Sequence, residues 1–87
     1  MYEISVKGKA RKAIERLPHG PHERVLKAVE DLAEEDPRPQ GARKMRGTDN
    51  LEEWRVRVGE YRVVYRVDED AIRVPILAAG PRGSVYR

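Results

Sequence analysis

The spacing of apolar residues divides the chain into a helical first half and a second half of strands. Residues 2–6 alternate between apolar and polar side chains, which predicts a short strand. Apolar residues then recur every three or four positions, as on one face of an amphipathic helix. We expect a first helix over residues 8–17 and a second helix that begins at Pro21 and ends at Asp36-Pro37, because proline cannot continue a helix.

The second half of the chain has the two-residue period of β-strands. Residues 54–58 alternate strictly, residues 61–67 alternate with one exception, and the intervening residues 59–60, Gly-Glu, are typical of a hairpin turn. Residues 72–79 predict a further strand, and residues 84–87 form a short end. Since these strands follow one another along the chain, we expect an antiparallel meander.

The order of the predicted elements gives an α+β fold of the form β-α-α-β-β-β. An N-terminal strand and a helical hairpin come first, and the helices pack on one face of the meander. Residues 37–41 are a linker inside the domain, because neither half of the chain could bury its apolar residues alone. We therefore expect residues 1–87 to form a single domain.

Composition limits the chemistry available to this domain. With 87 residues, of which 39% are hydrophobic, the chain can bury one thin core between two layers. It has no cysteine, which excludes disulfides, thiolate metal sites and a cysteine nucleophile. The longest apolar run, residues 76–79, is far too short to cross a bilayer, and the N-terminus lacks the apolar stretch of a signal peptide. We therefore expect a cytoplasmic protein that does not enter membranes.

Excess positive charge lies in the second half of the chain and consists mostly of arginine. Thirteen of the eighteen basic residues are arginine, and the net charge is +3. If residues 59–60 form the turn, the two-residue period places four arginines on the hairpin face that lies away from the helices: Arg55, Arg57, Arg62 and Arg66. Like charges paired across strands cost up to about 1 kcal/mol, so this face favours an anionic ligand, for which phosphate is the natural candidate.

Other residues extend this basic face or neutralise it. Three cations lie just before the hairpin, and we expect them to bind RNA together with Arg66: Arg43, Lys44 and Arg46. Arg82 and Tyr86 add a cation and an aromatic ring that could stack on a base. Alternatively, the three glutamates in residues 52–60 pair with the arginines, and Tyr86 is a core or surface aromatic. The residues themselves therefore indicate an RNA- or phosphate-binding sheet.

The order and spacing of several short motifs resemble the RelE/ParE superfamily, the RelE-type toxins of bacterial and archaeal toxin–antitoxin pairs. The resemblance covers almost the whole chain and rests mainly on four motifs: Lys44-Met45-Arg46-Gly47, Trp54-Arg55-Val56-Arg57-Val58, Gly59-Glu60-Tyr61-Arg62-Val63-Val64-Tyr65-Arg66-Val67, and Gly80-Pro81-Arg82 followed by Val85-Tyr86. It implies a ribosome-dependent endoribonuclease that cuts messenger RNA and thereby inhibits translation.

The resemblance also implies a reaction without a metal ion or cofactor, in which the 2′-hydroxyl of the RNA attacks the phosphate and leaves a cyclic phosphate. By position, the family's catalytic residues correspond to Arg55, Arg57, Arg62, Arg82 and Tyr86. The strand pair is arginine here, whereas the best-known branch has lysine, and Pro81 replaces a histidine that many relatives carry. Because arginine stabilises phosphate charge but is a poor proton acceptor, Tyr86 is the remaining candidate for the base.

The implied partners are a cognate antitoxin protein, the ribosome and its messenger RNA, and a toxin–antitoxin hetero-oligomer is expected. Two other functions fit the same fold. The ParE branch inhibits DNA gyrase by binding it and has no nuclease site, and a third alternative is a domain that binds RNA without cutting it. A basic or aromatic residue at all five matched positions favours the nuclease.

Overall fold

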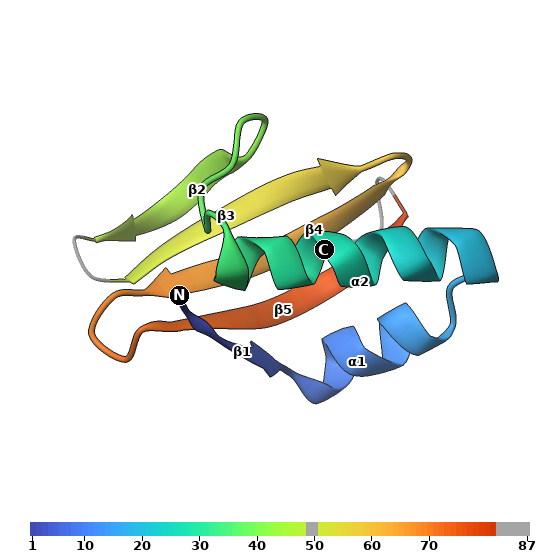
Figure 1. Cartoon of the computed structure of the whole chain (residues 1–87), viewed down its shortest axis with the longest axis horizontal. Coiled ribbons are helices and arrows are strands. Elements are labelled where there is room, and N and C mark those ends of the chain that lie inside the picture. Colours follow the sequence, from blue (N-terminus) through green and yellow to red (C-terminus); the bar gives the residue numbers. More distant parts are fainter. Residues whose placement is uncertain (49–50, 82–87) are drawn as a thin grey trace.

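The computed structural model describes residues 1–48 and 51–81, which form two helices on one face of a five-stranded sheet (Figure 1). The elements follow in the order β1 (Glu3–Val6), α1 (Gly8–Glu15), α2 (His19–Glu34), β2 (Arg43–Thr48), β3 (Leu51–Val58), β4 (Tyr61–Asp68) and β5 (Arg73–Pro81). The predicted α+β fold, with the helices before the meander, is confirmed. None of the described helices is long and apolar enough to cross a membrane.

The strands lie in the order β1-β5-β4-β3-β2. Strands β2 to β5 pair antiparallel with their neighbours, whereas β1 pairs in parallel with β5, so the sheet is mixed. The sequence did not predict β2 as a strand, because its residues RKMRGT have neither a two-residue period nor β-branched apolar side chains. Pairing with β3 at the edge of the sheet gives this segment its conformation, which is a tertiary effect.

The β3–β4 hairpin has the predicted register. Val58 pairs with Tyr61, and Arg57 pairs with Arg62, on either side of the turn. Gly59 has φ = 62°, and it is the one turn residue with a positive φ, as in a type II′ turn that favours glycine at the first central position. The turn residues therefore fix which side chains face one another across the two strands.

Both helices differ from their predicted limits at the turn between them. α1 ends at Glu15, two residues earlier than expected, and α2 begins at His19, two residues before Pro21. The first hydrogen bond of α2 runs from the His22 N–H to the Pro18 carbonyl oxygen over 2.8 Å. Pro21 therefore occupies the third helical position, where its missing N–H leaves no bond unmade because first-turn donors have no partner within the helix.

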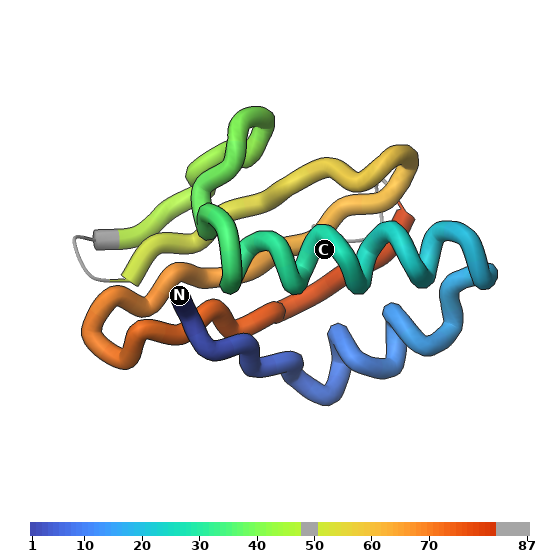
Figure 2. Tube along the Cα trace, viewed as in Figure 1, coloured from blue at the N-terminus to red at the C-terminus, as the bar shows by residue number. Residues whose placement is uncertain are grey.

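The hydrophobic core lies between the helices and the sheet, with α2 crossing in front of the strands (Figure 2). Its largest fully buried side chains come from α2, β4 and β5: Val25, Leu32, Val63, Tyr65, Val67, Val74 and Ile76. The Tyr65 hydroxyl donates a hydrogen bond of 2.6 Å to the Pro37 carbonyl oxygen, which satisfies both buried groups. Burial also raises the pKa of Tyr65. The bond fastens the segment after α2 to the sheet.

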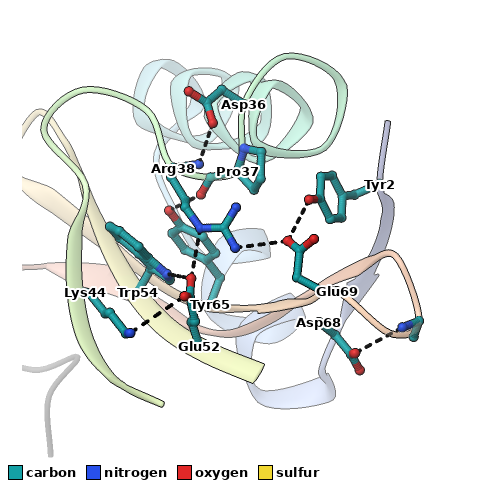
Figure 3. A network of polar contacts seen from close by, with 11 residues as sticks. Tyr2, Asp36, Pro37, Arg38, Lys44, Glu52, Trp54, Tyr65, Asp68 and Glu69 are labelled. Carbon is teal, nitrogen blue, oxygen red and sulfur yellow. Dashed lines mark hydrogen bonds and ion pairs between the residues drawn. The ribbon is translucent and has the colours of Figure 1, made fainter. Parts of the chain in front are cut away.

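A polar cluster connects the segment after α2 to residues from both halves of the chain (Figure 3). We call it the Arg38 cluster, and it comprises Tyr2, Arg38, Lys44, Glu52, Trp54 and Glu69. Arg38 donates from Nε to Glu52 over 2.8 Å and from Nη2 to Glu69 over 3.0 Å. Trp54 donates to Glu52 over 2.9 Å, and the Tyr2 hydroxyl donates to Glu69 over 2.7 Å. The sequence pattern did not reveal this cluster, because its members are far apart in the chain.

Candidate nucleic-acid interface

The sheet face opposite the helices carries the arginines that the two-residue period groups together; we call it the arginine face. Residues paired across neighbouring strands point to the same face of a sheet, so Arg57 and Arg62 lie side by side. Arg55 lies in the next row, between Arg43 of β2 and Val64 of β4. The arginine face therefore extends from β4 across β3 to the edge strand.

Carboxylates neutralise one part of the arginine face. Glu53, 9% exposed, lies between Arg46 and Arg66. Arg46 Nε donates to Glu53 Oε2 over 2.7 Å, and Arg66 Nε lies 3.8 Å from Glu53 Oε1. For Arg66, the alternative that glutamates of the hairpin pair with the hairpin arginines describes the structure, and Arg46, which precedes the hairpin, pairs with the same glutamate. Their charge is already partly balanced before any ligand binds.

Lys44 lies on the other face of the sheet, apart from the cations with which the sequence analysis grouped it. It pairs with Trp54 in the register, and its Nζ lies 3.6 Å from Glu52 Oε2 in the Arg38 cluster. An irregularity between Lys44 and Arg46 adds one residue to β2 and reverses the alternation, which brings Arg46 to the same face as Arg43. A period of two could not reveal this bulge.

Arg57 and Arg62 differ from the paired arginines. In the described part of the chain, no carboxylate lies within ion-pair distance of either guanidinium. Arg62 is only 8% exposed, and its guanidinium makes no hydrogen bond within the described part of the chain. Since no fully buried side-chain nitrogen among the described residues lacks a hydrogen-bond partner, the guanidinium nitrogens of Arg62 reach solvent. A largely covered cation without a counter-ion is expensive to desolvate, which favours the binding of an anion beside it.

A pocket of about 410 Å³ opens at the turn end of the hairpin. It is lined by Arg57, Gly59, Glu60, Tyr61, Arg62 and Pro81. Tyr61 pairs with Pro81, so the end of β5 lies beside the turn, as Figure 1 also shows. Two guanidinium groups can each offer parallel N–H donors to phosphate, so this pocket can hold a phosphodiester. Within the described ranges, no three His, Cys, Asp or Glu side chains are grouped as metal ligands.

Two of the five predicted catalytic residues, Arg82 and Tyr86, lie outside the described residues. Pro81, which directly precedes Arg82 in the chain, lines the pocket. Glu60 and Tyr61 also line the pocket but were not among the predicted site residues. A signal for them was present, because the predicted hairpin register puts both residues at the turn next to the paired arginines.

The chain matches a known toxin family over nearly its full length. The family model for the ParE toxin of the type II toxin–antitoxin system ParDE matches residues 4–86. The comparison with curated proteins gave no match. The matched range includes both helices and the whole of the arginine face.

Solved structures of RelE toxins share this fold. The archaeal RelE–RelB complex from Pyrococcus horikoshii OT3 contains a chain that is 32% identical, with a TM-score of 0.86 over 97% of this chain and 98% of that one. The toxin–antitoxin complex RelBE2 from Mycobacterium tuberculosis gives 28% identity and a TM-score of 0.62 over 93% and 98% of the two chains. The intact E. coli RelBE complex gives 25% identity and a TM-score of 0.72 over 93% of this chain and 96% of that one.

Proposed function

Because the chain belongs to the ParE toxin family within the RelE/ParE superfamily, and is thus a toxin of a type II toxin–antitoxin system, we propose that it cuts messenger RNA on the ribosome. The reaction is a metal-independent transfer within the RNA. The 2′-oxygen forms a bond to the adjacent phosphorus, and the bond from phosphorus to the 5′-oxygen breaks, which leaves a 2′,3′-cyclic phosphate and a 5′-hydroxyl. Negative charge develops on the phosphate and leaving oxygens, so the site must supply cations.

The pocket shared by Arg57 and Arg62 is the observation that carries this proposal. Both guanidinium groups lack a carboxylate partner among the described residues, and both line the same pocket. A phosphodiester placed there receives N–H donors from two neighbouring strands. Their positions are fixed by the β3–β4 register, so little reorganisation is needed when charge develops on the phosphate.

The remaining predicted site residues take supporting roles in this proposal. Arg55 continues the row of cations along β3, and Arg82 and Tyr86 complete the catalytic set from the C-terminal segment. The cations that guide the flanking RNA along the arginine face are Arg43, Arg46 and Arg66. Lys44 is left out, because it lies on the opposite face and pairs with Glu52.

The proposed partners are a cognate antitoxin, the ribosome and messenger RNA in the cytoplasm. The similar structures from P. horikoshii, M. tuberculosis and E. coli are toxin–antitoxin complexes, which supports a hetero-oligomer here. An antitoxin with acidic residues opposite the arginine face would complement its charge. We expect expression of the chain alone to stop protein synthesis and growth, measured by amino-acid incorporation, and co-expression of the antitoxin to restore both. Unchanged growth without the antitoxin would contradict a toxic activity.

The description of the matching family model favours a second candidate function. That model describes the ParE toxin, and the resemblance given above implies for the ParE branch an inhibitor that binds DNA gyrase. Such an inhibitor needs a surface complementary to a protein, whereas a nuclease needs a phosphate site with cations free to act. Arg57 and Arg62, which have no carboxylate partner among residues 1–48 and 51–81, line one pocket, and this is the reason to prefer the nuclease.

Cleavage on programmed ribosomes separates the two candidates. Purified toxin is added to ribosomes that carry a defined messenger, and cut sites are mapped by primer extension, while supercoiling by purified gyrase is followed in parallel. The nuclease proposal expects cuts at the ribosome's decoding site and no effect on gyrase. The double variant Arg57→Ala/Arg62→Ala should cut at least about 10²-fold more slowly, since two cations are lost. Intact messenger together with inhibited gyrase would establish the ParE-like function instead.

A further inference from the structure

One step of the proposed reaction has no assigned residue in the described site. The attacking 2′-hydroxyl must lose its proton as the oxygen bonds to phosphorus, so a base must lie within reach of it. Arg55, Arg57 and Arg62 are permanently protonated cations and are poor proton acceptors. Another group in or next to the pocket must take the proton.

Glu60 is the one carboxylate among the described residues that line the pocket. It is the second residue of the type II′ turn, so it lies one residue before Tyr61 and two residues before Arg62. No hydrogen bond or ion pair engages its carboxylate within the described structure. The other hairpin glutamates, Glu52 and Glu53, are already paired. Glu60 is therefore the acidic residue of the hairpin whose oxygens remain available.

The negative charge of Glu60 indicates a role in the pocket other than binding RNA. An ionised carboxylate repels the phosphates of RNA, so for binding alone an uncharged residue would serve better at this position. It also lies near two guanidinium groups without pairing to either, which leaves all three groups open to the same ligand. A pocket with two phosphate-binding cations and one proton acceptor has the parts that attack by a 2′-hydroxyl requires.

We infer that Glu60 is the general base of the cleavage reaction, an assignment that rests on the proposed nuclease function. A carboxylate oxygen of Glu60 takes the proton from the 2′-hydroxyl while the 2′-oxygen bonds to phosphorus. The electron pair of the breaking bond goes to the 5′-oxygen, and Arg57 and Arg62 stabilise the negative charge on the phosphate. The 5′-oxygen leaves with a proton from solvent or from a site acid, so no co-reactant is needed.

Single-turnover cleavage on programmed ribosomes tests the assignment. Glu60→Gln keeps the size of the side chain but removes the proton acceptor, and we expect the maximal rate to fall by about 10²-fold. Ribosome affinity should stay the same or increase, because a repulsive charge is lost. Glu60→Asp should keep part of the rate.

The matched control is Glu23→Gln, which makes the same change of charge at an exposed position of α2. Its rate and affinity should equal those of the wild type, and melting temperatures of all variants establish that each is folded. A Glu60→Gln variant that cuts at the wild-type rate overturns the assignment. If Tyr86→Phe is slow in that case, the proton goes to Tyr86. A wild type that leaves the messenger intact overturns the nuclease function, and the assignment fails with it.

Discussion

At the scale of single residues, the neighbours of an arginine decide what it can bind. Arg57 and Arg73 both lie on the arginine face, but Arg73 Nη2 is 3.3 Å from Glu3 Oε1, whereas Arg57 has no carboxylate partner in the described structure. An arginine that already has a carboxylate partner must give up that interaction to bind phosphate, so its net gain is smaller. The two residues therefore form a matched pair with equal charge and different availability.

We predict that Arg57→Ala weakens binding to programmed ribosomes and also slows cleavage. A charge-assisted contact to phosphate contributes about 1.5–3 kcal/mol, which corresponds to a loss of roughly 10- to 100-fold in affinity. The loss should appear in the dissociation constant as well as the rate, because the contact exists before and during the reaction. Arg73→Ala should change either quantity by less than about twofold, since surface ion pairs contribute little. Equal losses in both variants would mean that only total charge matters.

At the scale of elements, the pairing of β2 with β3 depends on Gly47. Its φ is +129°, and a β-carbon at this position would overlap the carbonyl oxygen of Leu51. Only glycine adopts this conformation without strain. The close approach keeps β2 against β3, and thereby holds Arg43 and Arg46 on the arginine face.

We predict that Gly47→Ala lowers the free energy of unfolding by about 2 kcal/mol or more, because backbone strain and a steric overlap add. Gly8→Ala is the control, since a β-carbon at Gly8, the first residue of α1, meets open space. That variant should be as stable as the wild type or up to about 1 kcal/mol more stable. Urea denaturation followed by circular dichroism measures both changes. A Gly47→Ala protein of wild-type stability would show that β2 tolerates a shift of register.

The Arg38 cluster makes the packing of the segment after α2 on the sheet sensitive to pH. Hydrogen bonds from Trp54 and Arg38 hold the pKa of Glu52 below its ordinary value of 4.5, and bonds from Tyr2 and Arg38 lower the pKa of Glu69 in the same way. A carboxylate whose pKa is lower in the folded chain stabilises the fold fully above its unfolded-state pKa. That contribution is lost as the pH falls through the folded-state pKa.

We therefore predict that the free energy of unfolding is constant near neutral pH and declines below about pH 4.5. Glu52→Gln should lose about 2 kcal/mol at pH 7, because its bonds to Arg38 and Trp54 lose their charge assistance. When the pH is lowered below about 4.5, the free energy of unfolding of Glu52→Gln should decrease by less than that of the wild type. Glu30→Gln, at an exposed position of α2, should follow the wild-type curve. Parallel curves for Glu52→Gln and the wild type would remove Glu52 from the pH dependence.

Across the whole molecule, the available arginines and the paired cations of the sheet lie towards opposite ends. The β3–β4 turn with its pocket is at one end, and the β4–β5 turn, which carries Glu69 of the Arg38 cluster, is at the other (Figure 1). If the proposed nuclease function holds, anionic RNA would be attracted to the end where cations lack described carboxylate partners. On that proposal, the arrangement would orient the pocket towards the nucleic acid during encounter.

We predict that the affinity for programmed ribosomes falls steeply as salt rises, because each phosphate contact releases condensed cations. For single-stranded RNA, each contact contributes about 0.7 to the slope of log affinity against log salt. Arg57→Ala/Arg62→Ala should thus reduce that slope by about 1.4, whereas Arg73→Ala should leave it unchanged. Filter binding over a range of potassium concentrations gives these slopes. An affinity that does not respond to salt would exclude phosphate contacts from binding.

The sequence by itself determined the types of all elements except β2, the β3–β4 register and the existence of the arginine face. These features depend on local physics, because amphipathic periods, proline stops and a glycine turn act over a few neighbouring residues. Arg57 beside Arg62 follows directly from Gly59 at the first turn position. The grouping of Arg55, Arg57, Arg62 and Arg66 on one face was therefore readable before the fold was known.

The tertiary structure alone decided which arginines are available and what else lies in the pocket. The strand β2, its bulge, the parallel pairing of β1 with β5 and the Arg38 cluster all join residues that are distant in sequence. The bulge separates Lys44 from Arg46, Glu53 pairs with Arg46 and Arg66, and the end of β5 closes the pocket beside Glu60. These pairings depend on which side chains, distant in sequence, come within hydrogen-bonding distance in the fold. The local period of apolar and polar residues does not encode such contacts.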